Sequence, residues 1–221
     1  MPVVVIASSK GGAGKSTTAV LLGTELAHQG VPVTMLDCDP NHSLSIWARK
    51  GTLPPNIQAI TDVTESSIVK TIKQHDTDGA VVIVDLEGVA SRMVSRAISQ
   101  ADLVLIPMRA TVLDATIGAQ SLQLIAEEEE AVDRKIAHAV VFTMTRHIRS
   151  KQERGIEASL REAGVDVVEP PLHERAAFSA LFEYGGNLHT MENKQGNMDA
   201  AIKNASAFAR AIYKRLAEAL A

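Results

Sequence analysis

Short, continuous apolar runs rich in β-branched residues recur along this chain, and stretches of helical length separate most of them. The runs lie at residues 3–7, 31–36, 80–84, 103–106 and 139–142. Continuous apolar runs, unlike alternating ones, are typical of strands that are buried on both faces. We therefore expect an α/β fold in which a mostly parallel sheet is flanked by helices on both faces.

The stretches between the runs predict helices, and glycines mark where some of these helices should stop. The expected helices cover residues 15–29, 65–75, 90–99, 114–132, 150–163 and 198–220. Gly30, Gly79 and Gly164 lie where helices should end, because glycine readily adopts the left-handed conformation found there. The last helix is amphipathic. Its apolar stripe favours packing on the sheet, with a membrane surface as the alternative.

Size and charge limit the class of protein further. The 221 residues suit a single domain spanning 1–221, without a linker. Lys and Arg number 22 against 26 Asp and Glu, so contact with nucleic acid would need a local basic patch. The single cysteine, Cys38, excludes a disulfide framework within the chain and suits a reducing compartment. Since no long apolar segment suggests secretion or membrane spanning, we expect a cytoplasmic protein.

A glycine-rich segment, "SSKGGAGKSTT" at residues 8–18, follows the first predicted strand and precedes a predicted helix. Glycines at 11, 12 and 14 would let several backbone N–H groups point at one phosphate. Lys15 would then neutralise the β- and γ-phosphates, and the Ser16 hydroxyl would bind Mg²⁺. The general pattern G-x-x-x-x-G-K-[ST] has glycine where this chain has Ser9, and the rest of the pattern matches. The segment therefore predicts a phosphate-binding loop of the P-loop NTPase type.

Acidic side chains end two of the predicted strands. Asp37 and Asp39 lie in "MLDCDP", and Asp85 lies in "VVIVDLEG". Because parallel strands end at one edge of a sheet, the three carboxylates should lie near the glycine-rich segment. Magnesium needs few protein ligands, so Ser16 and a carboxylate would suffice. Alternatively, each Asp caps the helix that follows it.

Lys10 narrows the comparison to one family. The stretch "KGGAGKST" resembles the deviant Walker A motif of the ParA/MinD ATPases, in which an additional signature lysine precedes two glycines. The resemblance implies a homodimer in the ATP state, with Lys10 touching the phosphates bound by the opposite subunit. It implies a catalytic role for Lys10, Lys15 and Asp39, the last of which would position the attacking water. Asp37 and Asp85 would join Ser16 around the metal. The implied nucleotide-binding residues are Lys10, Gly11, Gly12, Ala13, Gly14, Lys15, Ser16, Thr17 and Pro171.

The resemblance extends to two later segments, "FTMTRHIRS" and "EPPLHER". In the family, the corresponding segments contact the nucleotide base, so Pro171 is the candidate on the adenine side. Arg175 is a candidate for dimer or DNA contact. Further candidates for DNA contact surround the start of the helix predicted at 150–163, namely Arg146, Arg149, Lys151 and Arg154. The alternative is an ordinary solvated face, whose charge is balanced by Glu153, Glu157 and Glu162.

The family resemblance implies a function and leaves its partners open. It implies a Mg²⁺-dependent ATPase, slow without its partner, that binds DNA non-specifically on the nucleoid and drives plasmid or chromosome partition, with a ParB-like activator. We expect no separate N-terminal DNA-binding domain, because the sequence begins at its first strand. The chain has Asn41-His42-Ser43 where relatives have Gln-Gly-Asn, and Leu86-Glu87-Gly88 where Pro-Pro is usual. The alternatives are a nucleotide-gated recruitment factor for conjugative or T-DNA transfer, and a MinD-like membrane-associated positioning ATPase.

Overall fold

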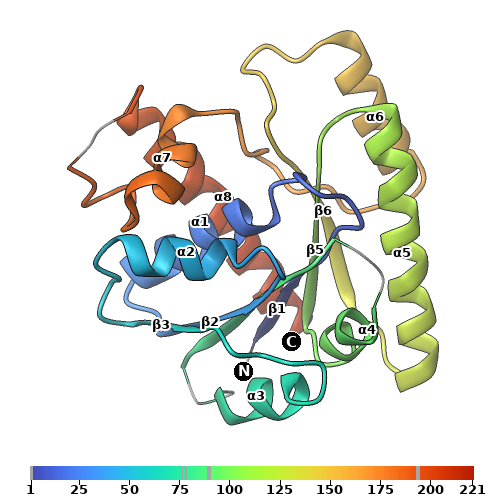
Figure 1. Cartoon of the computed structure of the whole chain (residues 1–221). Helices are drawn as coiled ribbons and strands as arrows, with labels where there is room; N and C mark the ends of the chain where they lie inside the picture. Colours follow the sequence, from blue (N-terminus) through green and yellow to red (C-terminus); the bar gives the residue numbers. More distant parts are fainter. Residues whose placement is uncertain (1, 76, 78, 89–90, 193–194) are drawn as a thin grey trace.

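A computed structural model describes residues 2–75, 77, 79–88, 91–192 and 195–221, and its centre is a six-stranded sheet (Figure 1). The strand order is β3-β2-β4-β1-β5-β6, and every pairing between these strands is parallel. The strands are β1 Val3–Ile6, β2 Val33–Cys38, β3 Ile57–Ile60, β4 Val81–Leu86, β5 Leu103–Met108 and β6 Ala137–Phe142. Every residue of β1, β2, β4 and β5 is buried, as the continuous apolar runs predict.

The register of the central strands positions the acidic residues. Ile6 at the end of β1 lies beside Asp85 on β4, and Asp85 lies beside Asp37 on β2. The loop that follows β1 therefore emerges next to two strand-end carboxylates. This is the edge of a parallel sheet at which ligands bind in open α/β folds.

Helices cover both faces of the sheet (Figure 1). One face carries α1 Lys15–His28, α2 Ser43–Lys50, α7 Ala176–Tyr184 and α8 Met198–Ala219, and the other carries α3 Ile68–His75, α4 Arg92–Ile98, α5 Val112–Val132 and α6 Lys151–Glu162. The helix expected at 90–99 begins at Arg92, and residue 90 lies outside the described residues. The fold class predicted from the sequence is thus confirmed.

The sequence does not predict three elements, which are α2, α7 and β3. Each is short, and β3 is an edge strand whose residues after Ile57 are partly exposed. In α2, Leu44 and Trp47 are fully buried although the helix as a whole is polar. Few apolar positions fix such short elements, so their tertiary contacts decide their structure.

The C-terminal helix packs on the sheet layer, as its apolar stripe predicts. Phe208 and Ile212 are fully buried in the same core cluster as Leu21 of α1. Ile202 is partly buried, and at the end of the stripe Leu220 is 50% exposed. The packing of α8 therefore uses most of the surface that a membrane-binding helix would need.

Candidate nucleotide-binding site

The glycine-rich loop runs from the end of β1 to the start of α1 and has a strongly curved backbone. Gly12 and Gly14 have φ angles of 72° and 90°, in the left-handed region that favours glycine. Gly14 is the N-cap of α1 and supplies no side chain to bind the first backbone N–H groups of the helix. These N–H groups are available to an anion, and the helix dipole favours one there.

Thr143, just after β6, is hydrogen-bonded to the glycine-rich loop. Its hydroxyl donates a hydrogen bond to the carbonyl oxygen of Ala13 at 2.7 Å. A Cβ atom on Gly14 would lie 3.3 Å from the Thr143 side chain. The position therefore favours glycine for its backbone angle and for its lack of space. The sequence analysis did not identify Thr143, because only the fold brings it to the loop.

A cavity of about 320 Å³ lies against the loop and contains most of the predicted phosphate-binding residues. Lys15, Ser16 and Thr17 line it from α1, and Asp39 lines it from the segment after β2. Its lining comprises Gly11, Gly12, Gly14, Lys15, Ser16, Thr17, Asp39, Asn41, Ser43, Gly88, Met144 and Phe182.

Gly88 brings the end of β4 against this loop. A Cβ atom on Gly88 would lie 3.3 Å from the backbone nitrogen of Gly11 and 3.4 Å from the Lys15 Nζ. Where the chain has Leu86-Glu87-Gly88 in place of the usual Pro-Pro, the structure thus has a close approach of two backbones beside Lys15. The sequence signal for this close approach is the glycine directly after "VVIVDLE".

Asp85 has the chemistry of a metal-supporting carboxylate. It is fully buried, and neither of its carboxylate oxygens accepts a hydrogen bond from the residues that the structure describes. The pKa of Asp85 is raised to about 7, chiefly by burial and also by the charges of Asp37 and Asp39, although the nearby Ser16 hydroxyl and Lys15 act to lower it. A buried carboxylate without partners is costly, and a divalent cation beside Ser16 would remove that cost. The residues present therefore fit Mg²⁺.

Asp37 and Asp39 are buried at the same edge but are partly engaged by their own chain. Asp37 accepts hydrogen bonds from the Ser45 backbone N–H, at 2.8 Å, and from the Ser45 hydroxyl. It thereby anchors the first turn of α2, which matches the alternative that the sequence left open. Asp39 Oδ1 accepts two hydrogen bonds from Asn41, from the backbone and the side-chain amide, both at 2.8 Å. The metal role of Asp37 and the catalytic role of Asp39 stay predictions.

No protein-only metal cage exists within the described ranges. There, no three His, Cys, Asp or Glu side chains converge in a geometry that could hold a metal ion. A magnesium ion at this site would need phosphate oxygens and water in addition to Ser16 and a carboxylate, which is its usual coordination beside nucleotides. Cys38 lies between Asp37 and Asp39 in the sequence. Burial raises the pKa of its thiol to about 12.

Lys10 forms an ion pair with Asp114 in the same chain. The Asp114 carboxylate also accepts hydrogen bonds from the Arg109 backbone N–H and the Thr111 hydroxyl, each at 3.0 Å. Burial raises the pKa of Asp114, but the Lys10 ammonium and these two hydrogen bonds together outweigh burial and hold the pKa below its ordinary value. The sequence analysis missed Asp114, although it is the acidic residue in the first turn of α5. The contact of Lys10 with a second subunit stays a prediction.

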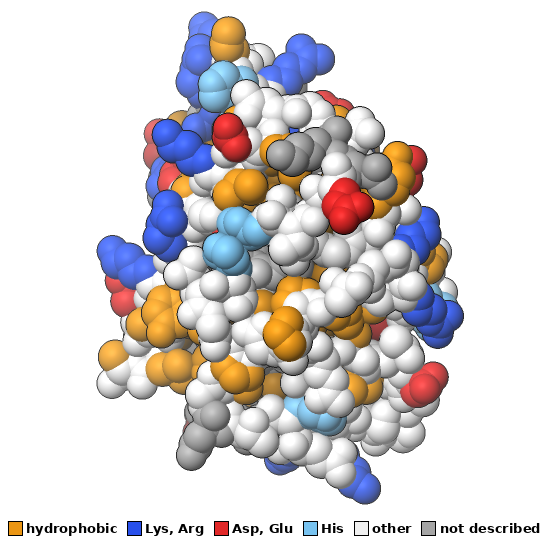
Figure 2. All heavy atoms as spheres, turned by 90° about the vertical axis from the view of Figure 1, so that its left-hand side faces the viewer, with side chains coloured by type: hydrophobic (Ala, Val, Ile, Leu, Met, Phe, Trp, Pro, Cys, Tyr) orange, Lys and Arg blue, Asp and Glu red, His pale blue; other side chains and the backbone are white. Residues whose placement is uncertain are grey.

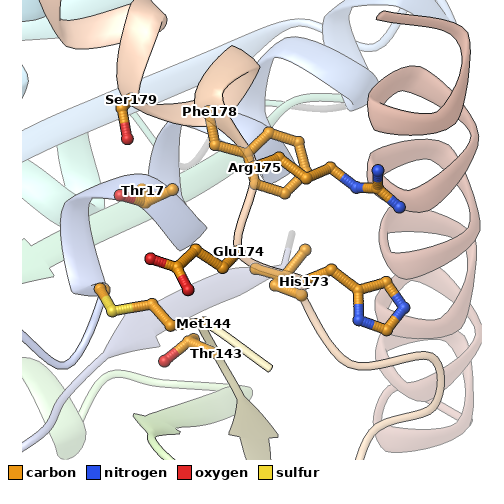
Figure 3. Close-up of a pocket in the computed structure, with 10 residues that line it drawn as sticks. Thr17, Thr143, Met144, His173, Glu174, Arg175, Phe178 and Ser179 are labelled. Atoms are coloured by element: carbon orange, nitrogen blue, oxygen red, sulfur yellow. The ribbon is translucent and has the colours of Figure 1, made fainter. Parts of the chain in front are cut away.

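A second pocket, of about 120 Å³, adjoins the cavity of about 320 Å³ beside the loop, which is called here the phosphate cavity (Figure 3). The two share Gly14, Thr17 and Met144. The second pocket, called here the base-side pocket, is also lined by Thr143, Leu172, His173, Glu174, Arg175, Phe178 and Ser179. Its position next to the loop suits the base and sugar of a nucleotide.

Pro171, the candidate on the adenine side, is not among the residues that line the base-side pocket. Pro171 is buried, and its carbonyl oxygen accepts a hydrogen bond from the Asn204 side chain at 2.8 Å. The lining of the base-side pocket begins at the next residue, Leu172. Residues 172–175 of this segment thus line a pocket beside the loop, and the adenine contact predicted for Pro171 stays a prediction.

The predicted DNA-binding residues separate into two groups. Arg146, Lys151 and Arg154 have exposed side chains. Arg149 instead pairs with Glu157 and Glu169, and Arg161 pairs with the same two acids. Of the acids that the alternative named, Glu157 is therefore the one in these ion pairs, and Glu169 was not predicted. Arg175 lies on the base-side pocket, and its side chain points away from Glu174 (Figure 3).

The fold and the loop together define a P-loop nucleotide-binding protein of the ParA/MinD class. Within that class, the chain belongs to the VirC1 protein family, whose family model matches residues 1–219. It is 79% identical to a protein named Protein ParA from Rhizobium radiobacter, over all 221 residues and the full length of both chains.

Solved structures share the fold at low sequence identity. The chain matches the ATP complex of a McdA variant from Cyanothece with a TM-score of 0.78 and 18% identity, over 96% of each chain. A putative plasmid partition protein from Borrelia burgdorferi, bound to AMPPNP, matches with a TM-score of 0.71 and 18% identity, over 97% of this chain and 99% of that one.

Proposed function

We propose that this protein is a Mg²⁺-dependent ATPase that dimerises on ATP, binds DNA without sequence preference and drives plasmid or chromosome partition. The observation that carries the ATPase part is Asp85. Its carboxylate is buried near the C-terminal end of β4, beside Ser16, and has no hydrogen-bond partner among the described residues. A magnesium–nucleotide complex would satisfy the carboxylate, Lys15 and the N–H groups of α1 at once.

In this proposal, the single domain works as a nucleotide-dependent pair. Lys10 leaves Asp114 and binds the phosphates held by a second copy. Two apolar side chains next to Asp114, Val112 and Leu113, are 61% and 63% exposed, so burying them would favour association on this face. Hydrolysis consists mainly of positioning, with Lys10, Lys15 and Mg²⁺ stabilising the charge on the phosphates and Asp39 orienting water.

The name and high identity of the Rhizobium radiobacter relative support the partition role, and a ParB-like protein is the proposed activator. DNA contact would use the exposed residues Arg146, Lys151 and Arg154. On the face shown in Figure 2, Lys and Arg side chains lie toward the margins, and several gather at the top, the level at which α6 begins in Figure 1. The protein would then reside on the nucleoid in the cytoplasm.

Filter retention of random-sequence DNA tests the proposal, with ATP, ADP and no nucleotide compared at several salt concentrations. We expect retention with ATP that falls steeply with salt and little retention with ADP, because two aligned patches neutralise more phosphates than one. Equal retention in the two nucleotide states would contradict a nucleotide switch.

A second candidate function follows from the VirC1 family match and from two relatives named Protein virC1, each 27% identical to this chain. In that case, the protein would be a nucleotide-gated recruitment factor for DNA transfer. Competition between one transfer-origin fragment and random DNA distinguishes the two functions. A strong preference for the fragment favours recruitment, whereas equal competition favours partition.

The MinD-like membrane role has less support. The apolar stripe of α8 packs against α1 and the sheet. Within the described part of the chain, no helix is long and apolar enough to cross a membrane. Liposome flotation of the protein with and without residues 198–221 tests surface binding, and flotation that depends on these residues would revive this alternative.

A further inference from the structure

Two short helices that the sequence does not predict, α2 and α7, both contribute to the proposed nucleotide site. The segment that leads into α2 supplies Asp39, Asn41 and Ser43 to the phosphate cavity. Helix α7 supplies Phe182 to the same cavity, and it supplies Phe178 and Ser179 to the base-side pocket. The two helices pack side by side (Figure 1).

The C-terminal ends of α2 and α7 are joined backbone to backbone. A Cβ atom on Gly51 would lie 2.4 Å from the backbone nitrogen of Gly186. A Cβ atom on Gly185 would lie 2.3 Å from the backbone nitrogen of Gly51. Real Cβ atoms do not approach backbone atoms so closely, so the two helix ends can meet only because both positions are glycine.

Two hydrogen bonds fasten the same ends. The buried Trp47 indole N–H donates to the carbonyl oxygen of Gly186 at 2.9 Å. The Lys50 ammonium donates to the carbonyl oxygen of Phe182 at 2.9 Å, near the C-terminus of α7 where the helix dipole also favours a cation. We call this set of contacts, made by Trp47, Lys50, Gly51, Gly185 and Gly186, the α2–α7 joint.

The start of α2 is fixed as well. Asp37 binds the Ser45 backbone and hydroxyl, so β2 holds one end of the helix and the joint holds the other. A shift of α7 must therefore move α2, and with it the segment that carries Asp39.

We infer that the α2–α7 joint positions the Asp39 segment and the wall formed by Phe178, Ser179 and Phe182 as one unit, so that the joint sets nucleotide affinity. This inference rests on the proposed ATPase function. When the joint opens, the two walls separate, and only the fraction of molecules with a closed joint binds nucleotide. The apparent dissociation constant rises by the inverse of that fraction. At saturating nucleotide, binding closes the joint again, and the chemical step is preserved.

The test compares Gly51→Ala with the wild-type protein in MgATP turnover and in calorimetric ATP binding. Gly51 has an extended backbone, with φ −139°, so alanine introduces the contact with Gly185 and Gly186 without backbone strain. We expect KM and Kd for ATP to rise about tenfold, with kcat within about twofold of the wild-type value. Because the proposed hydrolysis is slow, KM should follow the dissociation constant.

A milder variant and a matched control accompany it. Lys50→Met removes one exposed hydrogen bond of the joint and should raise KM about twofold to threefold without loss of folding. Gly155→Ala is the control, because a Cβ atom on this helical glycine of α6 meets nothing within 4 Å. KM and kcat of the control should equal those of the wild type.

The outcomes separate the inference from the proposed function. A wild-type protein that neither binds nor hydrolyses MgATP contradicts the proposed function. If the wild type is active, an unchanged KM in Gly51→Ala overturns the inference. A Gly51→Ala protein with a lower melting temperature and a lower kcat, but the same KM, overturns it as well. If Gly51→Ala does not fold, an unchanged KM in Lys50→Met overturns the inference by itself.

Discussion

The ammonium group of Lys10 and the carboxylate of Asp114 are paired within one chain, with Asp114 almost completely buried and Lys10 partly exposed. The pair ties the glycine-rich loop after β1 to the first turn of α5. In a single subunit, Lys10 is thus engaged by its own chain. Its proposed contact across a dimer requires this pair to be exchanged for a pair with phosphate.

The Asp114 carboxylate should stabilise the fold in a pH-dependent manner. Its pKa is lowered in the folded state, so its contribution is complete above the ordinary carboxyl pKa of about 3.9 and is lost as pH falls through the lowered value. Asp114→Asn should reduce the free energy of unfolding by about 1–3 kcal/mol at pH 7, with a smaller difference at pH 3. Urea unfolding measures both values. The exposed Asp133→Asn is the control, and a difference that does not depend on pH would contradict the expectation.

Asp85 should show the opposite pH dependence. Burial raises its pKa to about 7, so the charged form destabilises the nucleotide-free fold as pH rises from about 4 to above 7. Asp85→Asn should therefore raise the free energy of unfolding at pH 8 by roughly 1–3 kcal/mol, with little gain near pH 4.5. The same variant should lose the Mg²⁺ dependence of ATP binding. Calorimetry with and without magnesium checks the second result, and a variant as magnesium-dependent as the wild type would exclude Asp85 from the metal site.

Substitution of Lys15 should impair ATP binding, whereas substitution of Asp39 should impair ATP hydrolysis. Lys15→Ala removes the cation at the phosphates, so ATP binding in calorimetry should weaken by at least about tenfold, which corresponds to about 1.4 kcal/mol. Asp39→Ala leaves the loop intact, so ATP should still bind and drive dimerisation in size-exclusion chromatography while phosphate release stops. Lys73→Ala, on α3 at the opposite face, is the control for charge removal. Normal turnover in Asp39→Ala would remove this residue from the catalytic set.

The two groups of basic residues should separate DNA binding from stability. Lys151→Ala should reduce the salt dependence of ATP-dependent DNA binding by about one unit of slope for each subunit of the dimer and leave the melting temperature unchanged. Arg149→Ala should instead lower stability by about 0.5–1.5 kcal/mol, because it leaves Glu157 and Glu169 with fewer cations. Filter retention and thermal unfolding give the two readouts. Equal effects of the two substitutions on DNA binding would contradict the division.

The parallel sheet, the glycine-rich loop and the strand-end position of Asp85 could be predicted from short stretches of the sequence. The apolar runs predicted the parallel sheet, and the spacing of Gly11, Gly12, Gly14 and Lys15 predicted the loop that the structure places beside a cavity. Asp85 was identified because it directly follows a strand-forming run. In each case, neighbouring residues alone determine the conformation and its chemistry.

The features that were missed depend on contacts between distant segments. Thr143 meets the loop only because β6 is placed at the end of the sheet, 130 residues after Ala13. Gly88 and Asp114 likewise acquire their contacts with the loop from strand register. The hydrogen bond from Asn204 to Pro171 and the place of Leu172 in the base-side pocket also join segments that are distant in the sequence. Such contacts leave no periodic signal in one sequence.

The order of strands also governs how this chain can assemble during translation. Strand β1 lies between β4 and β5, and β2 pairs with β3 and β4, so before residue 81 is made only the β2–β3 pair has its partner. Closing such long connections slows folding. The nascent polypeptide therefore carries its first, entirely apolar strand without a pairing partner until β4, Val81–Leu86, has been made, which is about two-fifths of the 221 residues.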